Sequence, residues 1–156
     1  MRPATWIAFA MAVACGGGQT GSNHFAATLS AANEAPNNGS PATGTADYVL
    51  TGDGVVYTIT YANLSGPPGA SHIHVGAAGI NGPVVVPFSG LPTGTSGTFS
   101  GTFTTTGVKA GTSGTTTISA GNLDDILNAF RSGNAYTNIH TTANPGGEIR
   151  GQVTPK

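Results

Sequence analysis

Alternation of apolar and polar residues dominates the chain from residue 25 onward. The clearest run is residues 55–61, where every odd-numbered position carries a large apolar or aromatic side chain. Successive side chains of a β-strand point to opposite faces, so this run predicts a strand with one face in a core. Residues 45–51 form a similar run, and Gly52-Asp53-Gly54 joins the two as a hairpin connection.

Turn residues separate a series of further short apolar runs. These predict strands over residues 25–29, 71–75, 84–88, 98–104, 115–119, 135–141 and 148–153. Many short strands divided by Gly, Pro and Asn are typical of an all-β domain. The total of about nine predicts an antiparallel, Greek-key-like β-sandwich.

One segment departs from this alternation. Apolar residues at helical spacing occupy residues 122–131, behind Asn122, which is a favourable N-cap. Asp124 and Asp125 fall in the first turn, where negative charge is favourable, and Gly133 can end the helix. We therefore predict one short α-helix, with these aspartates as helix-end charges and not as a catalytic pair.

The low charge of the chain limits the classes of partner that it can bind. Charged residues make up 7% of the sequence and the formal net charge is −1. A basic surface that could hold the phosphates of a nucleic acid is therefore missing. No P-loop, dinucleotide fingerprint or Gly-x-Ser-x-Gly elbow is present, so we assign no catalytic residues and expect a protein that is not an enzyme.

The N-terminus has the layout of an export signal. Residues 1–14 pair one arginine with a short uncharged stretch, as in a signal peptide. The sequence Ala12-Val13-Ala14-Cys15 resembles the lipobox of bacterial lipoproteins, although Leu is usual at the first position. The resemblance implies that Cys15, the single cysteine, carries the lipid; the alternative is an incidental thiol beside an ordinary cleavage site. Residues 15–23 then read as a flexible tether.

Lipoprotein resemblance also implies a location. Gly16 stands where an Asp would retain a lipoprotein at the inner membrane. We therefore expect a protein of the cell envelope, in the periplasm at the outer membrane or at the cell surface, which meets the membrane only through its lipid.

Three motifs of the remaining chain resemble the CHRD (chordin-type) domain family. They are residues 135–152, with Ala-Tyr-Thr-Asn-Ile-His-Thr and Asn-Pro-Gly-Gly-Glu-Ile-Arg-Gly-Gln, residues 71–76, and residues 27–36, with Ala-Thr-Leu-Ser and Glu-Ala-Pro. The resemblance spans about residues 24–153. It implies a β-sandwich and membership among bacterial exported proteins of unsettled role, and it implies no general enzymatic activity.

Three of the four histidines lie in these motifs. His72 and His74 are two apart on a predicted strand, so both leave the face opposite the apolar Ile73 and Val75. His140 leaves its own strand on the side opposite Ile139. If the two strands are neighbours, the three imidazoles can converge on one metal ion at the surface.

Neutral imidazoles without thiolate or thioether ligands favour Cu(II) or Zn(II), and we expect copper. Glu148 and Asn138 are candidates to orient the ligands, as residues behind the metal ligands often do. A structural ion pair between Glu148 and Arg150 is the other interpretation of that carboxylate.

Two functions remain open on the sequence; a third, a redox or hydrolytic metalloenzyme, needs an open coordination position and a positioned acid or base, and the sequence establishes neither. The first is an exported metal-binding protein that uses His72, His74 and His140 for storage, sensing or delivery. The alternative is a structural or adhesive module that recognises a protein or glycan through its Thr-rich sheet faces and holds no metal. In that case the three histidines are ordinary surface or hydrogen-bonding residues, with His140 securing the turn at 144–147.

Overall fold

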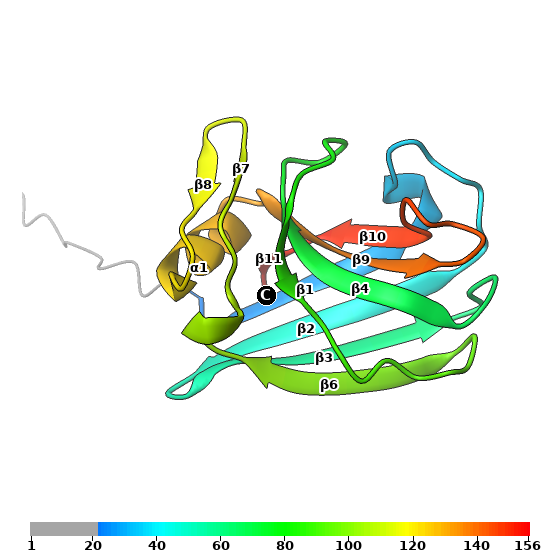
Figure 1. Cartoon of the computed structure of the whole chain (residues 1–156), viewed down its shortest axis with the longest axis horizontal. Coiled ribbons are helices and arrows are strands. Elements are labelled where there is room, and N and C mark those ends of the chain that lie inside the picture. The colour runs from blue at the N-terminus through cyan, green and yellow to red at the C-terminus, as the bar shows by residue number, and fades with distance from the viewer. Residues whose placement is uncertain (1–21) are drawn as a thin grey trace, which may run out of the picture.

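The computed structural model describes residues 22–156, and its chain is built almost entirely from β-strands (Figure 1). The strands are β1 (His24–Ser30), β2 (Thr43–Thr51), β3 (Gly54–Ala62), β4 (Pro68–Val75), β5 (Val84–Pro87), β6 (Gly97–Phe103), β7 (Gly111–Ser113), β8 (Thr116–Ile118), β9 (Ala135–Thr141), β10 (Ile149–Gln152) and β11 (Thr154–Pro155). One helix, α1 (Leu123–Arg131), and two short 3-10 turns, η1 (Ala31–Asn33) and η2 (Thr105–Gly107), complete the described part.

Nine strands belong to a single antiparallel sheet. Their order is β5-β4-β9-β10-β1-β2-β3-β6, with β11 added beside β1, while β7 and β8 form a separate two-stranded ribbon. The sheet curls until its ends approach each other: the ring of Phe88, just after β5, lies 4.4 Å from that of Tyr57 on β3 and 6.1 Å from that of Phe99 on β6. Two layers of one strongly curved sheet therefore enclose the core (Figure 1).

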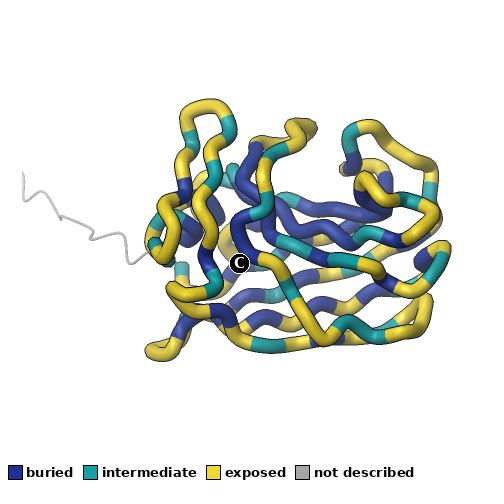
Figure 2. The backbone as a smooth tube through the Cα atoms, in the orientation of Figure 1, coloured by how far each residue is buried: buried dark blue, intermediate teal, exposed yellow. Residues whose placement is uncertain are grey.

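The core lies between these layers and is filled by the inward residues of each strand (Figure 2). Tyr48 on β2 and Thr137 on β9 share a hydrogen bond of 2.5 Å between their hydroxyls. These strands are three places apart in the sheet, so the bond crosses the interior. Phe130 of α1 packs against the rings of Tyr48 and Phe25, and thereby closes one end of the core.

The predicted all-β class with one helix is confirmed. The Asn122 side chain accepts the backbone N–H of Asp125 as the predicted N-cap, and Gly133 adopts a positive φ of 67° just beyond the helix. Two strands were missed, β7 and β11, because three and two residues are too short to show an alternation.

Part of the N-terminal interpretation lies outside the described residues. The predicted signal peptide, Cys15 and nearly all of the predicted tether precede residue 22. In the described range no helix is both long and apolar enough to cross a membrane.

Candidate metal centre

The pairing of β4 with β9 brings the three motif histidines together. His72 lies opposite Asn138, and Ala70 lies opposite His140, so His72 and His140 are diagonal neighbours on one face of the sheet. His74 extends the same face from β4. The three imidazoles each offer one nitrogen, and these nitrogens all lie within 4.8 Å of one another.

Alternation along both strands is observed as expected. Ile73, Val75 and Ile139 are fully buried in the core, and the histidines leave the opposite face. The expectation of an open surface position was wrong, however: His74 is only 9% exposed and the other two are half-buried. The cause is a set of loops that cover this face, described below.

Backbone carbonyls orient two of the rings. The Nδ1 atom of His74 lies 2.8 Å from the carbonyl oxygen of Gly82, and Nδ1 of His140 lies 2.9 Å from that of Pro145. A carbonyl oxygen can only accept, so each Nδ1 carries the proton and each Nε2 keeps its lone pair. Nδ1 of His72 lies 3.3 Å from Nε2 of His140. Because Nε2 of His140 carries no proton, it accepts this hydrogen bond from Nδ1 of His72, and a metal ion held by all three rings would replace that bond.

The loop from residue 76 to 83 holds the carbonyl that orients His74. The Gly82 N–H donates to the Tyr136 hydroxyl, and a Cβ on Gly82 would stand 1.7 Å from the carbonyl oxygen of Val75. Only glycine leaves the space for this close approach of two backbone segments. Tyr136 in turn stacks on the His74 ring, with centroids 4.8 Å apart and planes 6° from parallel.

Burial sets the protonation of the cluster. It lowers the pKa of His72 to about 4, with the neighbouring His140 and His74 adding to the effect. Burial is also the main cause of the lowered pKa of His74 and of His140, opposed in each by the hydrogen bond to a backbone carbonyl. All three rings are thus neutral near pH 7, which is the form that binds a metal ion.

Two buried polar atoms at the cluster have no hydrogen-bond partner. One is Nε2 of His74, and the other is Oδ1 of Asn138. The Asn138 side chain lies close enough to His72 and His74 to oppose the burial that lowers their pKa. Buried polar groups are nearly always satisfied, so these two lone pairs are open to a hydrogen-bond donor such as water or to a ligand that accepts electron pairs. A metal ion has that property.

A layer of polar side chains continues this face beyond the histidines. The Arg150 guanidinium lies 4.7 Å from the centroid of the Tyr136 ring and 3.7 Å from the Glu34 carboxylate. Asn81 accepts from Arg150 and donates to the carbonyl oxygen of Ala35. The loops on either side thereby meet over β10, and both charged side chains are almost completely buried.

The contacts of Arg150 and Glu148 differ from the prediction made for them. The predicted ion pair between them is not formed, because Arg150 pairs with Glu34. Glu148 precedes β10, so strict alternation does not apply to it. Its carboxylate accepts hydrogen bonds from the hydroxyls of Ser40, Ser65 and Thr141 and from the backbone N–H of Ser65.

Glu148 was also predicted to orient the metal ligands from behind, and its contacts show which groups it binds instead. Thr141 follows His140 directly, so its side chain leaves β9 on the opposite face. Hydroxyl groups, and not an imidazole, are thus the hydrogen-bond partners of this carboxylate. Asn138, the other candidate, lies beside His72 in the register of the sheet.

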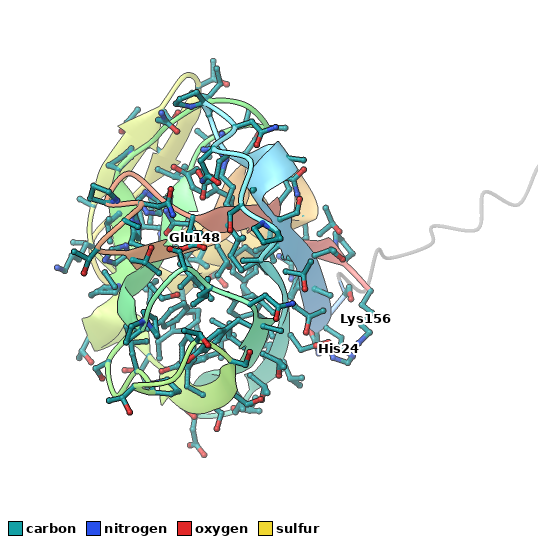
Figure 3. All side chains as sticks on the ribbon, turned by 90° about the vertical axis from the view of Figure 1, so that its right-hand side faces the viewer. His24, Glu148 and Lys156 are labelled. Carbon is teal, nitrogen blue, oxygen red and sulfur yellow. The ribbon has the colours of Figure 1, made fainter. Side chains whose placement is uncertain are left out.

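The fourth histidine lies elsewhere. His24 begins β1 and stands beside the C-terminal Lys156, far from Glu148 in the view that labels all three (Figure 3). The sequence had no signal for the backbone groups of Gly82 and Pro145, or for Asn81, because these contributions come from loops whose path the alternation does not predict.

The fold and the cluster together define an all-β domain whose covered sheet face holds three converging imidazoles. The model of the CHRD domain family matches residues 25–153, so the chain belongs to that family. The match covers the sheet, the helix and all three histidines of the cluster. No curated protein and no solved structure matches the chain.

Proposed function

We propose that this protein is an exported binding protein for a transition metal, with copper favoured over zinc, held by His72, His74 and His140. The observation that carries the proposal is the convergence of three neutral imidazoles, two of them oriented by backbone carbonyls, whose nitrogens lie within 4.8 Å of one another. Structural histidines usually have both nitrogens satisfied, and here the buried Nε2 of His74 is left free. No catalytic role is proposed, because among the described residues the cluster consists of the three imidazoles alone.

Substitution of one ligand tests the proposal. In His74→Ala the most buried of the three nitrogens is lost, and the affinity for copper should fall at least about a hundredfold, as expected when a ligand is removed from a three-ligand site. The measurement is competition against a chromophoric chelator of known affinity. His24→Ala is the matched control, because it removes an exposed histidine outside the cluster and should leave the affinity unchanged. Equal and weak binding by wild type and both variants would reject the proposal.

The proposal includes attachment of the protein to the cell envelope. The lipobox-like sequence before Cys15 supports lipidation of that cysteine, and the following glycines support a tether between the lipid and the domain. The protein purified from membranes should begin at Cys15, and its intact mass should exceed that of residues 15–156 by a lipid moiety. A mature protein that begins at another residue, without added mass, would contradict this part alone.

A second candidate function has an observation of its own. Thr28, Thr45, Thr60 and Thr98 form one row across β1, β2, β3 and β6, and all four are exposed. An uncharged row of hydroxyls suits recognition of a glycan or a protein by a structural or adhesive module. Under that function, copper and zinc should leave the melting temperature unchanged, since a ligand bound only by the folded state must raise it.

A further inference from the structure

Asn138 lies among the three histidines of the cluster. It stands directly opposite His72 in the pairing of β4 with β9, so His74 is its diagonal neighbour, and His140 follows two residues later on the same face of β9. Opposite residues on one face of a sheet are in side-chain contact, and diagonal neighbours are within reach of long side chains. The Asn138 amide is thus bordered by all three imidazoles.

The amide oxygen of Asn138 is shielded from solvent and has no donor from the protein. Asn138 is 2% exposed, and its Oδ1 atom has no hydrogen-bond partner among the described residues. Arg150 lies opposite on β10, but its Nη2 atom, which also lacks a partner there, does not bond to this oxygen. The guanidinium is held by the loops instead, because Nε donates to the carbonyl of Asn33 and Nη1 donates to the side chain of Asn81.

An amide oxygen in this place can complete the coordination of a metal ion. Three imidazoles leave one position open on an ion that prefers four ligands, as zinc does, and water or an added anion takes that position unless the protein fills it. Copper accepts an amide or carbonyl oxygen as a weak additional ligand beside stronger ones. The Oδ1 atom of Asn138 has the lone pair that the open position requires.

We propose that Asn138 is the fourth ligand of the metal centre, through Oδ1, and that it closes the site to added anions. This inference rests on the proposed function and adds a ligand to the three histidines. It gives Asn138 a role beyond orienting those ligands from behind. A centre with four protein ligands suits the holding of an ion, whereas an open fourth position is typical of a metal centre that acts on a substrate.

Replacing the amide by an apolar group of similar size tests this role on the full chain. Asn138→Leu removes the oxygen and should lower the affinity for Cu(II) and for the probe ion Co(II) at least about tenfold. In the metal-free protein the same change removes a buried oxygen that has no partner, so the melting temperature should stay the same or rise. A buried amide with a purely structural role would instead lower it when lost.

Thr137→Val is the matched control, because it changes the neighbouring position of β9 on the core side. It loses the hydrogen bond to Tyr48 and should leave the metal affinity unchanged. Asn138→Asp keeps an oxygen ligand of nearly the same shape, so it should bind Co(II) at least as tightly as wild type. Weaker binding by Asn138→Asp would overturn the inference even if Asn138→Leu does not fold.

Azide added to the Co(II)-loaded protein shows whether the fourth position is closed. Its binding, followed through the visible absorption of Co(II), should be at least about tenfold weaker in wild type than in Asn138→Leu, because only the variant leaves that position to water. Equal azide and metal affinities in these two proteins would overturn the inference and would mean that a water molecule satisfies Oδ1. If His74→Ala still weakens metal binding, the three-histidine site stands. Failure of wild type to bind Cu(II) or Co(II) overturns the proposed function as well.

Discussion

The same alternation in the sequence predicts the outer faces of both layers, but in the fold one of these faces is exposed to solvent and the other is covered. On β1, β2, β3 and β6 the outward positions carry mainly threonine, and Thr45, Thr58 and Thr60 are exposed to solvent. On β9 and β10 the outward positions include Asn138 and Arg150, which are each 2% exposed. Alternation correctly separates inward from outward residues on both layers, but it does not show which outward face meets water.

Loops account for the difference. Asn38 donates to the carbonyl oxygens of Gly147 and Glu148, and Asn81 links the loop after β4 to the segment after η1. These contacts place a second, polar layer over β9 and β10. All four buried side-chain atoms without a hydrogen-bond partner in the described part of the chain belong to this region: Glu34 Oε1, His74 Nε2, Asn138 Oδ1 and Arg150 Nη2. The outer face of β1, β2, β3 and β6, which we call the open face, has no such atom among the described residues, since its polar atoms can bind water.

The largest expected difference in stability is between two variants that each remove one partner of an ion pair, one pair on each face. Arg150→Ala leaves the Glu34 carboxylate buried without its cation and should lower the free energy of unfolding by about 3–5 kcal/mol. Lys156→Ala breaks a pair that is shorter, at 2.6 Å to Asp47, yet its side chain is 54% exposed. That loss should stay below about 1 kcal/mol. Urea denaturation of both variants measures the difference.

Equal and small losses in these two variants would mean that solvent reaches Arg150 and that the loops do not seal the covered face. Glu34→Gln is a useful third variant. It removes the charge while it keeps the shape of the side chain, so it separates the ion pair from the packing around it.

Acid should destabilise the fold through Glu148, whose hydrogen bonds lie on the side of β9 opposite the histidines. Burial alone would raise the pKa of this carboxyl, but hydrogen bonds from Ser65, Thr141 and Ser40 outweigh burial and lower it to about 2. The folded pKa lies below the unfolded value of 4.5, so the stabilisation is present above pH 4.5 and disappears as the pH falls toward 2. Up to about 3 kcal/mol should be lost over that range.

The Glu148→Gln variant isolates this contribution, because its stability should change less than that of wild type between pH 4.5 and 2. Asp53→Asn, in the exposed turn between β2 and β3, is the control. Glu34 acts in the opposite sense: burial raises its pKa to about 7 against the pull of Arg150, so its contribution falls as the pH rises from 4.5 to 7. Parallel acid profiles for wild type and Glu148→Gln would show that Glu148 is not the acid-sensitive group.

The smallest effect is expected on the open face. The Thr60 and Thr98 hydroxyls are 2.9 Å apart and exposed, so water can replace the hydrogen bond between them. Thr60→Val should change the free energy of unfolding by less than about 0.5 kcal/mol and should leave copper affinity unchanged. Thermal denaturation and the chelator competition measure both quantities. A loss above about 2 kcal/mol would show that this face is covered too, by contacts absent from the described chain.

Much of the fold follows from local pattern. Nine of the strands, the helix with its Asn122 cap, and the outward direction of His72, His74 and His140 were all predicted. Each depends on the spacing of residues within one short segment, where side-chain periodicity is a direct consequence of backbone geometry. The family resemblance extends over nearly the same residues as the observed match.

Periodicity within one segment does not predict the contacts between distant segments. Arg150 was expected to pair with Glu148, two residues away. It pairs instead with Glu34, which lies near the other end of the domain in the sequence. The carbonyls that orient His74 and His140 belong to turns, where no periodicity indicates which atom faces which ring.

The sequence by itself determined which residues lie on each side of every strand, and thus that three imidazoles leave the core. Only the tertiary structure decided that β4 pairs with β9, that loops close over the pair, and that the rings become neutral. The physical reason is that side-chain direction is set by adjacent peptide units, whereas burial and charge environment depend on chain segments that meet only after folding.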